Sequence, residues 1–248
     1  MKKILITLAI ILSHSLQGSV EDGISAYHEK NYETAFSEFK KAADSDDPKG
    51  IHLLASLYYT GHGVKKDVSK AVDLFKKAGE KRYAPSLSNL GLMHLNGDGV
   101  EIDLSKALSY YEAAFELGNS EAGFSLGQIY RKGERVKNDY DKAKGYYLKA
   151  AMLGHAGAMN EVGMLYAQGL GVEVDYVEAY AWVKIAADAG VLPAKRNIPN
   201  FDSILSKKDR SKAKNRIEEI LSRVKKQENK SAHTTSASAR RVASTLQI

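Results

Sequence analysis

A stretch of the chain repeats itself every 36 residues, which is the distance from Gly61 to Gly97, and this period constrains the fold more than any other feature. The repeat continues through four copies in one register without a gap. A fixed period of this length predicts a row of stacked units in place of one globular core, and such rows usually bind other molecules. The recurring columns are glycine at Gly61, Gly97, Gly133 and Gly169; valine at Val64, Val100, Val136 and Val172; aspartate at Asp67, Asp103, Asp139 and Asp175; and alanine at Ala71, Ala107, Ala143 and Ala179 and again at Ala78, Ala114, Ala150 and Ala186.

Each unit is predicted to form two helices. In the first helix, apolar residues recur at helical spacing, as in Leu126 and Tyr130, so one face is expected to be buried. A small residue such as Gly127 lies beside them and would let a neighbouring helix approach closely. Glycine inside a helix costs about 1 kcal/mol relative to alanine, so packing must offset that cost. In the second helix, adjacent large residues such as Tyr146 and Tyr147 are interpreted as packing between units.

The turn inside each unit has its own chemistry. Gly61 and Gly63 are expected to end the first helix, with one of them at positive φ, where a side chain would clash. Asp67 and its equivalents then occupy the expected N-cap of the second helix, where the carboxylate accepts from free backbone amides at about 1 kcal/mol per cap. In the last unit, Asp175 and Glu178 form a capping-box pattern.

This pattern resembles the Sel1-like repeat, a relative of the tetratricopeptide repeat. The spans Ala122 to Ala143 and Ala158 to Ala179 follow it most closely, and the resemblance covers about residues 50–192. It implies an all-α fold, an α-solenoid superhelix of stacked antiparallel helix pairs.

The chain departs from the family pattern at three positions. Arg135 replaces the second turn glycine of the third unit, which must alter that turn or force an unusual backbone there. His94 replaces a tyrosine. Arg82 stands where the other units carry Gly118, Gly154 and Gly190.

The ends of the array differ from its middle, as the terminal units of a stack should. Residues 20–44 are predicted to form a shorter helix pair with a tetratricopeptide-like turn, and Pro199 is expected to interrupt the first helix after the last repeat. Ser206 and Asp209 offer a helix start before an apolar stripe. The predicted organisation is a signal peptide at 1–18, an N-terminal capping pair at 19–49, repeats at 50–85, 86–121, 122–157 and 158–193, capping helices at 194–226, and a disordered, basic, Ser/Thr/Ala-rich tail at 227–248.

The first residues read as a secretory signal. Lys2 and Lys3 precede a short apolar run from Ile4 to Leu12, followed by small and polar residues to Gly18. We therefore expect export through a cleavable signal peptide to the periplasm or the outside of the cell. The chain has no cysteine, which excludes disulfides and thiol chemistry.

The charge is unevenly distributed. Residues 19–194 carry 20 Lys and Arg against 25 Asp and Glu, a net charge of −5, whereas residues 195–248 carry 14 against 5, a net charge of +9. The basic C-terminal segment could touch an anionic envelope surface, or it could be a solvated helix face and tail. Nucleic acid is not an expected partner of an exported protein.

The sequence lacks the groupings that an active site needs. No catalytic residue, cofactor or metal site is predicted, because the histidines are scattered without i, i+4 pairing and the Gly-x-Gly turns lack the Lys-Ser/Thr of a phosphate loop. Ser37-x-x-Lys40 matches part of a penicillin-binding motif, but Ser-Asp-Asn and Lys-Thr-Gly are absent.

Resemblance to tetratricopeptides places a partner-binding groove on the first helices, at the positions two before, two after and five after the leading leucine. Apolar residues among them would form a band rimmed by polar groups, which suggests a partner surface. If the helix phase is shifted by one position, the same residues pack between units. The candidate groove residues are His52, Ser56, Tyr59, Ser88, Leu92, Leu95, Phe124, Gln128, Arg131, Asn160 and Met164.

The predicted function is that of an exported, non-enzymatic adaptor that binds a protein or peptide in this groove. Two alternatives stay open. One is a cell-envelope hydrolase acting on β-lactam or peptidoglycan, with Ser37 as the residue to test. The other is a binder of envelope polymers that uses the basic C-terminus.

Overall fold

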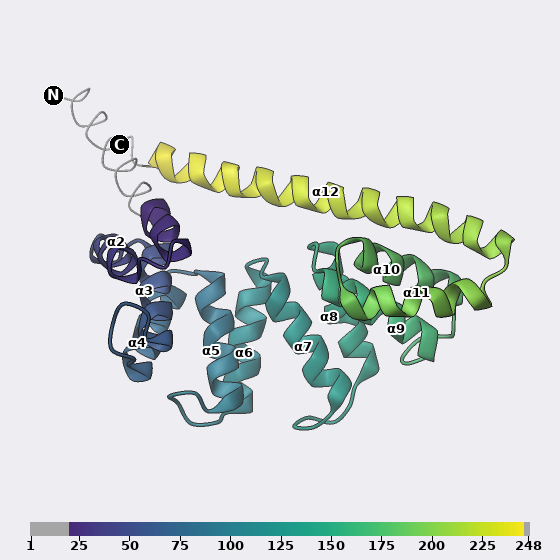
Figure 1. Ribbon diagram of the computed structural model, residues 1–248, viewed down its shortest axis with the longest axis horizontal. Coiled ribbons are helices and arrows are strands. Elements are labelled where there is room, and N and C mark those ends of the chain that lie inside the picture. Colours follow the sequence, from purple (N-terminus) through teal and green to yellow (C-terminus); the bar gives the residue numbers. More distant parts are fainter. Residues whose placement is uncertain (1–19, 246–248) are drawn as a thin grey trace. The chain divides into compact units, whose positions relative to one another are not determined.

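The computed structural model describes residues 20–245, and every regular element among them is an α-helix (Figure 1). The boundary between two compact units falls after Asn119. Unit 1 contains a helix over residues 20–28, α2 (Tyr32–Asp44), α3 (Pro48–Thr60), α4 (Val68–Glu80), α5 (Ala84–Asn96) and α6 (Leu104–Glu116); unit 2 contains α7 (Ser120–Lys132), α8 (Tyr140–Met152), α9 (Ala156–Gln168), α10 (Tyr176–Asp188), α11 (Leu192–Ile204) and α12 (Lys207–Thr245). The predicted signal peptide at 1–18 lies outside the described residues.

Consecutive helices pack as pairs, which confirms the all-helical fold class that the resemblance implies. The pairs are α3 with α4 and α5 with α6 in unit 1, and α7 with α8 and α9 with α10 in unit 2. We call the leading member of each pair a first helix and the other a second helix. In unit 2, α10 also packs against α11 and α12.

The small residue of each first helix sets how closely its pair can pack. A Cβ atom placed on Gly127 would lie 2.5 Å from the ring of Tyr147, and one on Gly91 would lie 2.9 Å from the ring of Tyr111. Both tyrosines are buried. The large residues of the second helices therefore pack against the first helix of their own pair, and not only between units as the sequence pattern suggests. Tyr146 behaves in the same way, since its ring stacks on Tyr130 of α7 at 5.8 Å.

The turn inside each pair uses more left-handed backbone than expected. Gly61 has φ 82° and Gly63 has φ 68°, so both glycines, and not one, need the conformation that side chains disfavour. Arg135 stays outside this region, so the third turn is altered there and its backbone is not forced into a left-handed conformation. Arg82, unlike Arg135, adopts the left-handed conformation: its φ is 61°, and the equivalent Gly118 has φ 88°. A left-handed L-residue costs roughly 1–2 kcal/mol, so Arg82 is a strained position in unit 1.

The aspartate column caps the second helices as predicted. The Asp67 carboxylate accepts from the Lys70 amide at 3.0 Å, and Asp139 accepts from the Lys142 amide at 2.9 Å. The backbone amide of the capping residue is also used, because Asp67 N–H donates to the Tyr58 carbonyl at 2.9 Å. Each aspartate therefore ties the start of the second helix to the end of the first.

The capping box predicted in the last repeat forms only by half. Asp175 accepts from the amides of Val177 and Glu178 at 2.8 and 2.9 Å. The Asp175 amide, however, donates to the Tyr166 carbonyl at 3.1 Å, so the Glu178 side chain is not needed there. Glu178 turns toward α12 and binds Arg216.

The C-terminal helices are more continuous than the sequence suggested. Pro199 lies inside α11 without ending it: the ring removes one backbone hydrogen bond of the helix, but the buried residues Ala194 and Phe201 hold both sides of it against the fold. Helix α12 starts as predicted, with Ser206 Oγ accepting from the Asp209 amide at 3.1 Å. It runs to Thr245, although the sequence predicts a disordered tail at 227–248, of which 246–248 lie outside the described residues; the span 207–245 contains no glycine or proline to end the helix. No described helix is both long and apolar enough to cross a membrane.

Candidate binding faces on the first helices

The candidate groove residues form three columns, and the structure separates them by exposure. In the column two positions before the leading leucine, His52, Ser88 and Phe124 are half-buried and Asn160 is buried. In the next column, Leu92 is 45% exposed while Ser56, Gln128 and Met164 are half-buried. The third column, with Tyr59, Leu95 and Arg131, is half-buried throughout.

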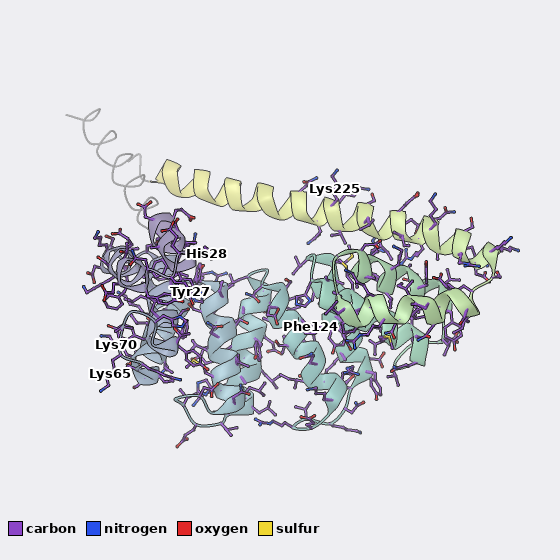
Figure 2. All side chains as sticks on the ribbon, in the orientation of Figure 1. Tyr27, His28, Lys65, Lys70, Phe124 and Lys225 are labelled. Atoms are coloured by element: carbon purple, nitrogen blue, oxygen red, sulfur yellow. The ribbon has the colours of Figure 1, made fainter. Side chains whose placement is uncertain are left out.

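Two members of the first column, His52 and Phe124, turn toward the following repeat. In unit 1, the His52 ring lies 5.2 Å from that of Tyr83 and 5.3 Å from that of Phe75, and its Nδ1 is 2.9 Å from Ser86 Oγ. In unit 2, the Phe124 ring stacks on that of His155 at 4.5 Å. Figure 2 shows Phe124 on α7. These two side chains pack between consecutive pairs, which is the arrangement expected from a shifted helix phase.

The packing of His52 makes the stability of unit 1 depend on pH. Burial lowers the pKa of His52 to about 4, against about 6.5 for a free histidine. As the pH falls, His52 is protonated in the unfolded chain at a higher pH than in the folded one. The free energy that the buried neutral ring contributes to folding is therefore fully present above about pH 6.5 and is lost as the pH falls toward 4. The free energy of unfolding should drop by on the order of 2 kcal/mol across this window. Urea unfolding at several pH values, for the wild type and for His52→Gln, measures the difference; equal pH slopes in the two proteins would contradict the assignment.

The other unit 1 candidates lie nearer the surface. Leu92 on α5 is exposed, and Leu95 and Ser88 lie half-buried on the same helix. On α3, the Ser56 hydroxyl donates to the His52 carbonyl at 3.0 Å. The Tyr59 hydroxyl donates to Asp98 at 3.3 Å, which joins the first helix to the turn of the next pair.

In unit 2, the first helices share a polar cluster. Arg131 Nε of α7 lies 3.4 Å from Glu161 Oε2 of α9, and Asn160 Nδ2 donates to Glu161 Oε1 at 3.3 Å. The Tyr147 hydroxyl belongs to the same cluster: burial raises the pKa of its phenol, the Glu161 charge raises it further, and Arg131 opposes both. We call Arg131, Tyr147, Asn160 and Glu161 the α7–α9 polar cluster.

Three buried atoms of this cluster have unused hydrogen-bonding capacity. Tyr147 Oη and Asn160 Oδ1 have no hydrogen-bond partner within the described part of the chain, and Arg131 Nε has only its 3.4 Å ion pair with Glu161 and no hydrogen bond. Buried polar groups in folded proteins are almost always paired, so a concentration of unpaired ones calls for an explanation. A donor, an acceptor and a hydroxyl that can act as either stand together here.

The last two unit 2 candidates lie on the same helices as the cluster. Gln128 is half-buried on α7. Met164 Sδ on α9 accepts from Asn197 Nδ2 of α11 at 3.5 Å. Tyr147 and Glu161 were not predicted as site residues. Tyr147 fits the pattern of a packing residue, and Glu161 lies next to the candidate Asn160 in the sequence. That adjacent carboxylate was the only signal for Glu161.

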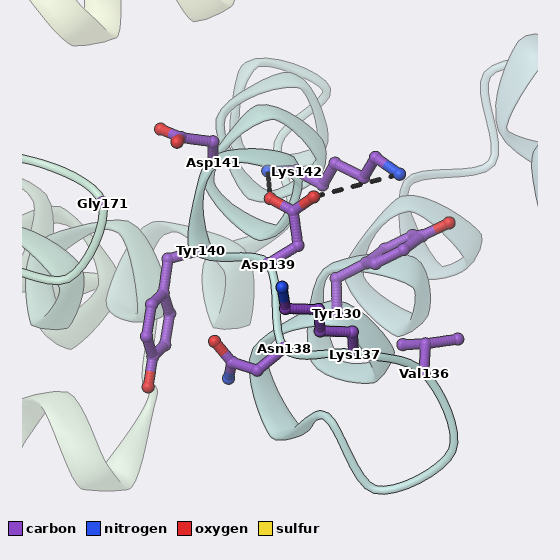
Figure 3. A pocket seen from close by; sticks show the side chains of 9 residues that line it. All are labelled: Tyr130, Val136, Lys137, Asn138, Asp139, Tyr140, Asp141, Lys142 and Gly171. Atoms are coloured by element: carbon purple, nitrogen blue, oxygen red, sulfur yellow. Dashed lines mark hydrogen bonds and ion pairs between the residues drawn. The ribbon is translucent and has the colours of Figure 1, made fainter.

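A shallow pocket of about 690 Å³ lies beside the turn between α7 and α8 (Figure 3). Its charged groups already serve the turn: Asp139 caps α8, and Lys142 Nζ lies 3.9 Å from Asp139 Oδ2 and 5.0 Å from the centre of the Tyr130 ring. Lys144 Nζ closes the neighbouring turn by donating to the Gly171 carbonyl at 2.6 Å. The charged residues beside the pocket therefore stabilise the turns of the repeats, and the pocket needs no ligand to explain them.

The residues named for the hydrolase alternative do not converge. Ser37 is exposed on α2, and the Lys40 ammonium forms an ion pair with Asp44 at 2.6 Å. Among the described residues, no group of three or more His, Cys, Asp or Glu side chains could hold a metal ion.

Consecutive helix pairs, joined by glycine turns and aspartate caps, define a helical-repeat protein. The chain belongs to the Sel1 repeat family, whose model matches residues 19–47, 48–83, 84–119, 120–155 and 156–191. The matched repeats start two residues before the predicted ones, at 48 and not 50 for example. They also include the N-terminal pair at 19–47, for which the sequence predicts a tetratricopeptide-like cap.

Solved structures share this fold. A Sel1 repeat protein from Oxalobacter formigenes is 28% identical over 73% of this chain and 74% of its own, with a TM-score of 0.65. A protective antigen of uropathogenic Escherichia coli is 29% identical with a TM-score of 0.66, over 75% of this chain; the match spans only 40% of that protein. An immunity protein from Pseudomonas aeruginosa, at 22% identity and a TM-score of 0.52 over 81% of this chain and 82% of its own, shows the fold alone. No curated protein sequence matches the chain.

Proposed function

We propose that the chain is an exported, non-enzymatic adaptor that binds a protein segment on the exposed face of its first helices. The α7–α9 polar cluster is the observation that carries this proposal. The main chain of a bound segment offers carbonyls that can accept from Arg131 Nε and N–H groups that can donate to Asn160 Oδ1. The Arg131 side chain is 36% exposed, so it can move to admit such a group.

The exposed side of unit 1 offers an apolar contact to a partner. Leu92 is a large apolar side chain at the surface of α5, bordered by half-buried Ser88 and Leu95. A leucine that becomes fully buried by a partner contributes about 1.5–3 kcal/mol. Main-chain hydrogen bonding in unit 2 suits a protein segment more than a small molecule, and the exposed leucine of unit 1 suits an apolar side chain of a partner.

Export is part of this proposal. The N-terminal signal-like segment supports it, as does the similarity to a protein described as a protective antigen. The partner would then be a protein of the envelope or of the cell exterior.

Crosslinking in the native organism, followed by identification of the captured protein, provides a purified partner for affinity measurements. We expect Leu92→Glu and Asn160→Ala each to weaken partner binding about tenfold or more, because each removes a contact that the partner would desolvate. Ile102→Glu is the matched control: it also puts a carboxylate in place of an exposed apolar residue in unit 1, but in a turn. If Ile102→Glu weakens binding as much as Leu92→Glu, or if neither first-helix change has an effect, the proposal is wrong.

A further inference from the structure

The solvent-facing side of α12 carries the densest positive charge of the described chain outside the repeats. Between Lys207 and Lys226, only Glu218 and Glu219 are exposed anions, and Asp209 is half-buried. The buried side of the helix is apolar, with Ala213, Ile220 and Val224 against the rest of unit 2. The exposed cations of this span are Lys207, Lys208, Arg210, Lys212, Lys214, Arg223, Lys225 and Lys226.

Part of this charge lies in one line along the helix. At about 100° per residue, Lys207, Arg210, Lys214 and Lys225 all fall within about 40° of the direction of Leu221. We call these five residues the α12 stripe. From Lys207 to Lys225 the stripe is about 27 Å long at the helical rise, which is enough to contact several anionic groups together.

The cations of the stripe are mostly unneutralised. Lys207, Lys214 and Lys225 form no ion pair within the described part of the chain, and Arg210 reaches Asp202 only at 4.0 Å. On the buried side of the same helix, by contrast, Arg216 is bound at 2.7 Å by Glu178. Charge that a fold leaves unpaired along one side of a helix is available to an external anion.

Exposed apolar side chains accompany these cations. Leu221, between Lys214 and Lys225 in the stripe, is 46% exposed, and Ile204, just before the helix, is 56% exposed. A polyanion in water gains nothing from a leucine, whereas a lipid surface accepts basic side chains at its headgroups and apolar ones beneath them. We propose that the α12 stripe docks the protein on an anionic lipid surface, with the cations at the headgroups and Leu221 inserted between them.

The test is cosedimentation of the full-length protein with vesicles of phosphatidylcholine, with and without phosphatidylglycerol. We expect binding only to the anionic vesicles, weakened by salt. The triple change Lys207→Gln, Lys214→Gln and Lys225→Gln should lower the partition constant roughly 100-fold, since each basic residue near such a surface contributes about 1 kcal/mol. Lys225 is marked in Figure 2.

A matched control removes the same charge elsewhere. Lys65, Lys76 and Lys132 are exposed on the repeats, and changing all three to glutamine should alter binding less than twofold. All these lysines are exposed, so thermal unfolding should be alike in the three proteins, and the N-terminal segment is the same in each. Equal loss in both triple variants, or binding that ignores phosphatidylglycerol, would overturn the proposal.

Leu221→Gln separates a lipid surface from a soluble polyanion. On a lipid surface, this change should lower binding about tenfold while all charges remain. If the wild type binds heparin as tightly as anionic vesicles, and Leu221→Gln leaves vesicle binding unchanged, the partner is a polyanion and the lipid assignment is wrong.

Discussion

Replacing Gly163 by alanine should destabilise unit 2 by about 2–3 kcal/mol, although alanine favours helices. A Cβ atom at this position would lie 2.6 Å from Val183 Cγ2, 2.8 Å from the Ala179 carbonyl oxygen and 3.1 Å from the Val183 amide nitrogen. Two of these neighbours are backbone atoms and cannot rotate away, so α9 and α10 would have to separate. Overpacking of a core costs about 1–3 kcal/mol, and separation of buried Val162 and Val183 adds to it, while the gain in helix propensity is about 1 kcal/mol.

Gly145 is the matched control for this change. It lies inside α8, and a Cβ atom there would meet nothing within 4 Å. Gly145→Ala should therefore stabilise the protein by about 1 kcal/mol through helix propensity and backbone entropy. Urea unfolding followed by circular dichroism measures both. If Gly163→Ala is as stabilising as Gly145→Ala, the small column does not set the distance between paired helices.

Arg216→Ala should cost about 3 kcal/mol and release α12 from α10. The Arg216 guanidinium donates to both Glu178 oxygens, at 2.7 and 2.9 Å, and Trp182 Nε1 donates to one of them at 2.9 Å. The hydrogen bonds to Glu178, and after them the one to Glu219, raise the pKa of Arg216 above its usual value. The Glu178 side chain is 13% exposed, so removing its partner leaves a charge with little water around it, which is the costly way to break an ion pair.

Hydrogen exchange locates the effect. In Arg216→Ala, the amides near Ile220 and Val224 should exchange much faster than in the wild type, because the end of α12 loses its attachment. Arg223→Ala, on the exposed side of the same helix, should change neither stability nor exchange beyond a few tenths of a kcal/mol. Unchanged exchange in Arg216→Ala would show that apolar contacts alone hold α12.

The repeat period and its turn chemistry could be predicted because they depend on neighbouring residues. The aspartate caps act within three residues, and the glycine turns follow from local backbone sterics. The same locality explains one error: Asp175 and Glu178 matched a capping box, but the Glu178 carboxylate binds a residue 38 positions away, and no local pattern could reveal Arg216.

The candidate faces were harder to predict, because a first helix packs on more than one side. It contacts its own second helix, the second helix of the preceding pair and, through single side chains, the next pair, so its buried arc is wider than an apolar stripe suggests. His52 and Phe124 therefore point into contacts between pairs, while Leu92 points outward. The unpaired atoms of the α7–α9 polar cluster depend on how α7, α8 and α9 meet in three dimensions, which residue spacing does not encode.

Hydrogen exchange on the protein with its captured partner bound tests the proposed function most directly. The account predicts protection on the first helices, around Leu92 on α5 and between Arg131 and Glu161 on α7 and α9, with little change on the second helices α6 and α8. Protection confined to the second helices, or to α12 alone, would contradict it.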